Sequence, residues 1–111
     1  MRVSVLKSKL HGGRITSCRP DYEGSIAIDA TLLEKAGIRK YEKVLVADMD
    51  NGSRFETYAL SGGKGEISVN GGAARLCRAG HRVCVFSFAS VGPREKAEPV
   101  VIILDSKNRP K

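Results

Sequence analysis

The chain has 111 residues, of which 41% are hydrophobic and 28% are charged, and its formal net charge is +7. This length suits one folded domain and is too short for two, and the composition excludes a disordered chain. The longest apolar runs are strand-sized and far shorter than the roughly 20 residues of a membrane helix, so we predict no membrane association. Charges interrupt every apolar segment of the first nine residues, unlike a signal peptide, and predict a cytoplasmic protein.

Short segments rich in β-branched residues dominate the chain and predict a single mainly β domain over residues 1–111. In chain order, the predicted strands are residues 3–6, 14–18, 25–28, 44–47, 55–60, 66–69, 82–88 and 100–104. Turn signals lie between them at residues 12–13, 50–52, 62–65 and 91–93. Such regular spacing favours a closed barrel or a sandwich.

One helix is predicted between the third and fourth strands. Asp29 can cap its N-terminus, an apolar face is supplied by Leu32, Leu33 and Ala36, and Gly37 favours a left-handed end. A second, short helical turn is predicted at residues 72–76, where alanines lie between glycines. The polar residues 92–98 are expected to form a surface loop or a short helix.

The chain contains three cysteines, Cys18, Cys77 and Cys84, and no close Cys-x-x-Cys pair. This pattern predicts reduced thiols rather than disulfides. A zinc site is an alternative, because His81 lies between Cys77 and Cys84 and Cys18 could supply a fourth ligand. However, the Cys-x3-His-x2-Cys spacing departs from the usual paired ligands, and Cys84 lies among apolar residues. We therefore predict no metal site.

The positive charge can attract an anionic partner, either a nucleic acid or a small dicarboxylate. The basic residues are spread along the chain, and the aromatic share is 5% with no tryptophan, so stacking surfaces for bases are scarce. We predict no nucleic-acid partner. A non-catalytic basic β-barrel module that binds nucleic acid or an acidic partner is kept as the alternative function.

The pair Gly24-Ser25 precedes an apolar strand and could be an ordinary turn. A serine hydroxyl can also attack the carbonyl carbon before it and convert the amide into an ester, and glycine tolerates the strained backbone that this attack requires. Elimination and hydrolysis would then leave a pyruvoyl group in place of the serine. Such a ketone can act as a covalent Schiff-base cofactor that accepts electrons during decarboxylation of an amine substrate.

Four motifs occur in order: Lys9-Leu10-His11, Tyr22-x-Gly24-Ser25, Asn51-Gly52-x-Arg54-Phe55-x-Thr57-Tyr58-Ala59 and Ile67-Ser68-Val69-Asn70-Gly71. Together they resemble the aspartate 1-decarboxylase family over nearly the whole chain. The resemblance implies a six-stranded double-psi β-barrel with short flanking helices, a homotetramer, and self-cleavage between residues 24 and 25 into a small N-terminal and a larger C-terminal chain. It also implies conversion of L-aspartate to β-alanine and carbon dioxide for pantothenate biosynthesis. A maturation helper protein is left open.

The resemblance further implies catalytic roles. Ser25 is the precursor of the pyruvoyl group, and Gly24 becomes the end of the smaller fragment. Thr57 matches a residue that stabilises the oxyanion of self-cleavage, and Tyr58 matches the proton donor after carbon dioxide leaves. Arg54 matches a residue that binds a substrate carboxylate, for which a guanidinium offers two parallel hydrogen bonds.

Further substrate-binding residues are implied on two other segments. Lys9 and His11 point the same way from an extended segment, with Lys9 at the charged end of the substrate and His11 near the processing site. The loop implied to close over the substrate consists of Asn70, Gly71, Gly72 and Ala73. Without the resemblance, these residues would be interpreted as surface side chains and an ordinary turn.

The chain departs from the family pattern at Gly12-Gly13, at residues 18–20, at Gly72, at His81 and in its short C-terminal end. These departures affect efficiency, oligomer contacts or processing, and none removes a residue with an implied role. A third hypothesis for the function is a processed barrel that acts on a different amino acid.

Overall fold

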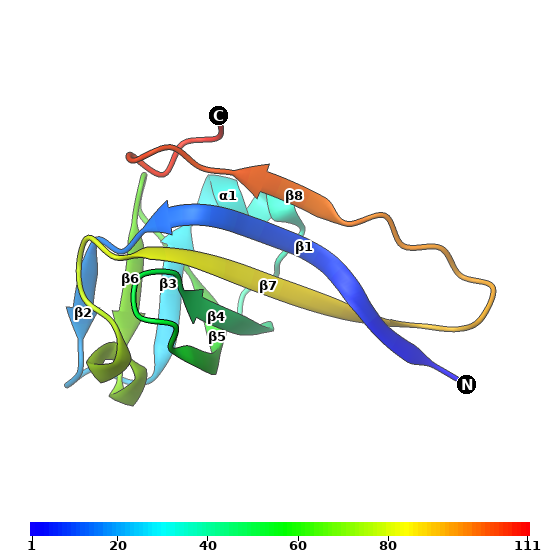
Figure 1. Ribbon diagram of the computed structural model, residues 1–111, viewed down its shortest axis with the longest axis horizontal. Helices are drawn as coiled ribbons and strands as arrows, with labels where there is room; N and C mark the ends of the chain where they lie inside the picture. Colours follow the sequence, from blue (N-terminus) through cyan, green and yellow to red (C-terminus); the bar gives the residue numbers. More distant parts are fainter.

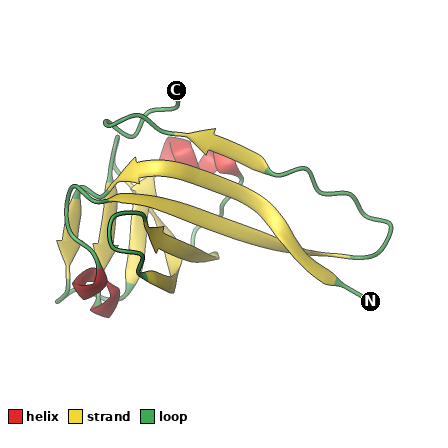
Figure 2. Cartoon of the chain, viewed as in Figure 1, coloured by secondary structure: helices red, strands yellow, loops and turns green.

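The computed structural model describes residues 1–111 as a mainly β structure with two short helical segments (Figures 1 and 2). The strands are β1 (Val3–Arg14), β2 (Ser17–Arg19), β3 (Ser25–Asp29), β4 (Lys43–Asp48), β5 (Arg54–Gly62), β6 (Ile67–Asn70), β7 (Arg82–Val91) and β8 (Val100–Ile103). The helical segments are α1 (Ala30–Ala36) and the 3-10 helix η1 (Gly72–Leu76). None of the helical segments has the length and the apolar character needed to span a membrane.

The strands form one sheet in the order β2-β6-β3-β5-β4-β7-β1-β8. Strand β1 pairs with β7 antiparallel and with β8 parallel, while β3 pairs with β5 parallel and with β6 antiparallel. Figure 1 shows β1 and β7 as two long curved ribbons, with β2, β3 and β6 gathered near one end of them. No ladder joins β2 to β8, so the sheet is not closed. The predicted mainly β class is confirmed, and the eight strands agree in number with the eight segments predicted from the sequence, but the open sheet does not confirm the six-stranded double-psi β-barrel.

The first strand differs most from the sequence prediction. We expected a turn at Gly12-Gly13, and this expectation is wrong, because both glycines lie inside β1. The pairing with β7 shifts by one residue between His11 and Gly13, so Gly12 forms a β-bulge, and its positive φ of 79° explains why a glycine suits this position. A Cβ on Gly13 would lie 2.6 Å from the Ile67 side chain, so this glycine permits close packing.

Other local predictions are confirmed. The turn at residues 50–52 joins β4 to β5 as an antiparallel hairpin. Both predicted helical segments form, and α1 ends at Gly37 in the left-handed region with a φ of 69°. Residues 92–98 form an exposed loop between β7 and β8, without a helix. This loop extends away from the rest of the sheet (Figure 1).

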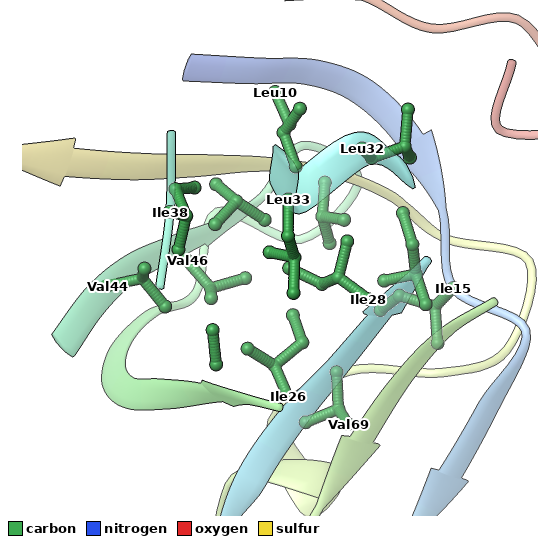
Figure 3. Close-up of a cluster of buried hydrophobic side chains, with 14 of the residues drawn as sticks. Leu10, Ile15, Ile26, Ile28, Leu32, Leu33, Ile38, Val44, Val46 and Val69 are labelled. Carbon is green, nitrogen blue, oxygen red and sulfur yellow. The ribbon is translucent and has the colours of Figure 1, made fainter. Parts of the chain in front are cut away.

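The hydrophobic core lies between the sheet and α1, as the side chains in Figure 3 show. Leu32 and Leu33 reach into it from the helix, and Ile26 and Ile28 enter it from β3. Successive strand residues point to opposite faces. Because Ile26 and Ile28 both point into the core, the side chain of Ser25 points to the opposite face. The packing of β3 thus decides which way the predicted nucleophile faces.

Asp29 connects α1 to the loop before β6. One carboxylate oxygen accepts a hydrogen bond from the Thr31 amide and the other from the Gly65 amide, each at 2.8 Å. Burial by itself would raise the pKa of Asp29, but these hydrogen bonds outweigh it and hold the pKa below its ordinary value. The carboxylate is therefore both a helix cap and a tie between two segments.

We expect the Asp29→Ala variant to lose about 1–2 kcal/mol of unfolding free energy, because one helix cap and one tertiary hydrogen bond disappear. Urea titration measures this loss, and Asp21→Ala, at an exposed position, is the matched control. Because the pKa is lowered in the folded state, this contribution is present above the ordinary aspartate pKa of about 4 and is lost as the pH falls below it. An equal stability of both variants at pH 7 would contradict the assignment.

Candidate active site

Ser25 occupies the first position of β3 and is 2% exposed. The antiparallel pairing of β3 with β6 sets Ser25 opposite Asn70, whose side-chain Nδ2 donates a hydrogen bond to Ser25 Oγ at 3.0 Å. The hydroxyl in turn donates to the carbonyl oxygen of Glu23 at 3.4 Å. A residue 45 positions further along the chain therefore holds the serine, through strand pairing.

Gly71 lies directly against the backbone of Gly24. Its φ of 82° and ψ of −159° fall in a region that essentially only glycine adopts. A Cβ on Gly71 would lie 2.5 Å from Gly24 Cα and 2.8 Å from Gly24 N. The amide of Gly71 donates to the Arg19 carbonyl at 2.9 Å, and η1 begins at the next residue. Gly71 therefore lies against the backbone of Gly24, next to the buried Ser25.

Asn70 carries a second feature of the site. Its Oδ1 is buried and has no hydrogen-bond partner, while its Nδ2 is bonded to Ser25. An unpaired buried amide oxygen is costly, and such atoms are rare in folded proteins. The oxygen is therefore a free acceptor next to the serine and suits a donor group of a bound molecule.

Tyr58 lies on β5, the strand next to β3. The parallel pairing of Ile26 with Ala59 puts Tyr58 level with Ser25 on the neighbouring strand. Its ring lies 6.1 Å from that of Tyr41, and both rings line an open cavity of about 340 Å³ together with Glu23.

Thr57 faces the other way from Tyr58, because strand residues alternate between the two faces of a sheet. No hydrogen bond joins Thr57 to Gly24 or Ser25. The oxyanion role implied for Thr57 stays a prediction.

Lys9, His11 and Arg54 form a second group, which we call the cationic cluster. The Lys9 ammonium lies 5.4 Å and the Arg54 guanidinium 5.9 Å from the centre of the Phe86 ring. The imidazole of His11 contacts the thiol of Cys84 at 3.3 Å. Cys84 and Phe86 are two residues apart on β7 and share a face, so the predicted common face of Lys9 and His11 is confirmed.

The surroundings of His11 are positively charged. Burial lowers the pKa of His11, and the charges of Lys9, Arg82 and Lys111 lower it further. The imidazole is therefore neutral at pH 7, and the charge of the cationic cluster resides on Lys9 and Arg54. A negatively charged ligand suits this face of the sheet.

The structure does not join the cationic cluster to the serine within one chain. Arg54 and Tyr58 lie on the same face of β5 but four residues apart, which corresponds to about 13 Å along a strand. No hydrogen bond or ion pair links Lys9, His11 or Arg54 to Gly24 or Ser25. The cationic cluster and the region around Ser25 are therefore two separate parts of the predicted site.

Sequence reasoning missed the residues that organise these two parts. Phe86 underlies the two cations, and Cys84 contacts His11, whereas Glu23 and Tyr41 line the cavity with Tyr58. The period-two pattern of residues 82–88 could have indicated that Cys84 and Phe86 share a face. No sequence signal connects Tyr41 with Tyr58.

The four residues of the zinc alternative do not meet at one point. The thiols of Cys18 and Cys77 are 3.6 Å apart, but Cys84 lies elsewhere, on β7. His81 instead forms a 2.6 Å contact through Nδ1 with the buried carboxylate of Asp48. Asp50 is the third potential ligand near this pair.

A buried serine bonded to Asn70, an open cavity lined by two tyrosines and the cationic cluster are the features of a small β enzyme. The family model described as aspartate decarboxylase matches residues 1–111. The chain is 46% identical over 110 residues to the aspartate 1-decarboxylase of Coprothermobacter proteolyticus, covering 97% of this chain and 92% of the relative. It is 47% identical over 109 residues to that of Haloquadratum walsbyi, covering 98% and 96%. The chain belongs to the aspartate decarboxylase family, so the family predicted from the four motifs is confirmed.

Proposed function

We propose that this protein converts L-aspartate to β-alanine and carbon dioxide, for pantothenate biosynthesis. Family membership over the full length of the chain supports the reaction. The observation that carries the proposal is the buried Ser25 hydroxyl, which Asn70 holds at 3.0 Å under the loop that begins at Gly71.

The proposed cofactor is a pyruvoyl group formed from Ser25 by self-cleavage after Gly24. Gly24 has no Cβ, and no atom of a non-neighbouring residue lies within 4 Å of the position where a Cβ would lie, so the side of Gly24 on which a side chain would lie is open. The Nδ2 of Asn70, which now donates to the hydroxyl, would donate equally to a ketone oxygen at the same position. The residues present therefore fit such a group, which supplies an electron sink for decarboxylation.

The remaining residues would bind the substrate and move a proton. Arg54 and Lys9 are proposed to hold the carboxylates of aspartate, since both present unpaired charge on one face. Tyr58, level with Ser25, is proposed to return a proton to the reacting carbon, directly or through a water. Thr57 is proposed to stabilise the oxyanion of self-cleavage.

We further propose that the working unit is a homotetramer. The separation of Arg54 from Tyr58, about 13 Å along β5, supports this assembly, because aspartate is too short to reach from Arg54 to the serine that lies level with Tyr58. A second copy could place its cationic cluster against the serine of the first. The exposed side chains of Val100, Val101 and Ile103 on β8 are consistent with contacts between copies.

We also propose that the strands close into the double-psi β-barrel. Strands β1 and β2 are consecutive and are separated only by Ile15 and Thr16. The amide of Ile15 bonds to His81 before β7, and the amide of Thr16 bonds to Ile67 of β6. Strand β1 pairs with β7, and β2 pairs with β6. If β1 and β2 act as one bent strand, this strand connects β7 with β6, the outer strands of the series β6-β3-β5-β4-β7, and completes a ring of six strands.

Denaturing mass spectrometry of the purified protein tests the proposal. We expect two masses, corresponding to residues 1–24 and 25–111, with a hydrazine-reactive carbonyl on the larger fragment, and we expect β-alanine release from aspartate. Incubating the protein alone and with cell extract distinguishes spontaneous from assisted cleavage. One intact, carbonyl-free chain under both conditions would contradict the proposal and favour the binding-module alternative. Turnover of glutamate in preference to aspartate would contradict the substrate assignment.

A further inference from the structure

Two of the three cysteines form a close thiol pair. The sulfur atoms of Cys18 and Cys77 lie 3.6 Å apart, and neither takes part in a disulfide. The strand pairing of β2 with β6 positions Cys18, while Cys77 follows η1 directly. The two residues are 59 positions apart in sequence, which explains why the spacing of the cysteines gave no sign of the pair.

The thiol pair lies between two segments near the proposed cleavage site, one that leads to Ser25 and one that packs against Gly24. Cys18 precedes the turn of residues 19–24 that leads to Ser25, and Cys77 ends the segment that starts with Gly71 on top of Gly24. Cleavage after Gly24 would leave Cys18 on the smaller fragment and Cys77 on the larger one. The two thiols would thus belong to different fragments and would lie near the single break in the processed backbone.

We propose that Cys18 and Cys77 are a disulfide-forming modification site that covalently joins the two fragments of the processed protein. This inference rests on the proposed self-cleavage for the joining of fragments, but not for the formation of the bond. A disulfide requires an S–S length of about 2.05 Å, so the sulfur atoms must approach by about 1.5 Å, within reach of small side-chain rotations.

The third cysteine is in a different environment. The sulfur of Cys84 contacts the imidazole of His11 at 3.3 Å and the sulfur of Met49 at 3.6 Å, and no other cysteine is near it. Cys84 is buried like Cys77, whereas Cys18 is half-buried. Cys84 therefore serves as an internal control for oxidation that is not directed by a neighbouring thiol.

The oxidant in this reaction is a low-molecular-weight disulfide. The Cys18 thiolate attacks one sulfur of the oxidant, forms a mixed disulfide and releases one thiol molecule. The Cys77 thiol then loses its proton, attacks the Cys18 sulfur and releases the second thiol molecule. Two protein thiols and one small disulfide thus give one protein disulfide and two small thiols, and excess reduced thiol reverses both steps.

The second step depends on pH. Burial raises the pKa of Cys77 to about 12, and the neighbouring Cys18 adds to this effect. The reactive thiolate of Cys77 is therefore scarce at neutral pH, and ring closure should speed up about tenfold for each unit of pH increase below that pKa. In a reducing compartment the pair stays as two thiols, and it closes when small disulfides accumulate.

Oxidised glutathione provides the test on the processed protein, with mass spectrometry under denaturing, non-reducing conditions. We expect one species in which fragments 1–24 and 25–111 are joined and two hydrogen atoms are lost, and dithiothreitol should separate it into two. The Cys18→Ser and Cys77→Ser variants should each give separate fragments, whereas Cys84→Ser should still give the joined species. Separate fragments from the wild-type protein after oxidation would overturn the proposal, as would loss of the joined species in Cys84→Ser.

The uncut Ser25→Ala chain separates this proposal from the proposed cleavage. Its free thiols, counted after denaturation, should fall from three to one on oxidation, with Cys84 as the remaining thiol. If all three thiols remain free, the disulfide proposal fails even if cleavage of the wild-type protein occurs. If one thiol remains and the wild-type protein is nevertheless uncut, the disulfide proposal holds and the proposed function fails.

Discussion

The Ser25→Ala variant is expected to stay uncut and to lose β-alanine release by at least about a million-fold, which is the lower range of enzymatic rate enhancements. Alanine has no hydroxyl to attack the Gly24 carbonyl carbon, so neither the ester nor the ketone can form. The substitution removes one oxygen atom from a buried position and leaves β3 and its inward-facing isoleucines unchanged. The loss should therefore reflect chemistry rather than unfolding.

Mass spectrometry and a β-alanine assay measure this result, and circular dichroism checks the fold. Ser4→Ala is the matched control, because Ser4 is exposed near the start of β1 and takes part in no side-chain hydrogen bond. The control should be cut and active like the wild type. Aspartate turnover by an uncut Ser25→Ala chain would remove Ser25 from the mechanism.

The Gly71→Ala variant is expected to slow cleavage by at least about tenfold and to lower the unfolding free energy by about 1–3 kcal/mol. Alanine disfavours the backbone conformation with a φ of 82°, and its Cβ would lie 2.5 Å from Gly24 Cα. The backbone of Gly24 must then move away from Gly71. Because the nucleophile acts on the Gly24 carbonyl, such a movement disturbs the bond that is to be cut.

Gly72→Ala, one residue further on, is the matched control for Gly71→Ala. A Cβ on Gly72 would meet no atom within 4 Å, and the φ of Gly72 is not positive. This variant should therefore be cut at the wild-type rate and should unfold at the wild-type urea concentration. Equal cleavage rates for the two variants would show that the tight contact at Gly71 has no part in processing.

Local sequence signals predicted those elements of the fold that depend on neighbouring residues. The helix start at Asp29, its left-handed end at Gly37 and the hairpin at residues 50–52 all follow from side-chain caps and turn preferences. The bulge at Gly12 was missed, since a glycine pair is typical of a turn as well as of a bulge. The sequence alone does not distinguish these two uses.

The candidate site could be predicted only in part, because strand pairing between distant segments creates most of it. The motifs named Ser25 and Asn70 separately, but only the register of β3 with β6 brings them within 3.0 Å. The same holds for the position of Phe86 between Lys9 and Arg54, which depends on the pairing of β1 with β7, of β7 with β4 and of β4 with β5. The period-two alternation of a strand predicts the face of the sheet on which a side chain lies, but it does not predict which strand is the neighbour.

The ladder between β1 and β7 has a thermodynamic consequence for a chain cut after residue 24. Strands β1 and β2 would then belong to a separate peptide, held by β7, β8 and β6 along most of its length. Melting would release two molecules instead of one, so the melting temperature of the cut form should fall on dilution, as for a heterodimer. Melting of the uncut chain would release no second fragment, so its melting temperature should depend less on dilution than that of the cut form, and calorimetry of both forms at several protein concentrations would measure the difference.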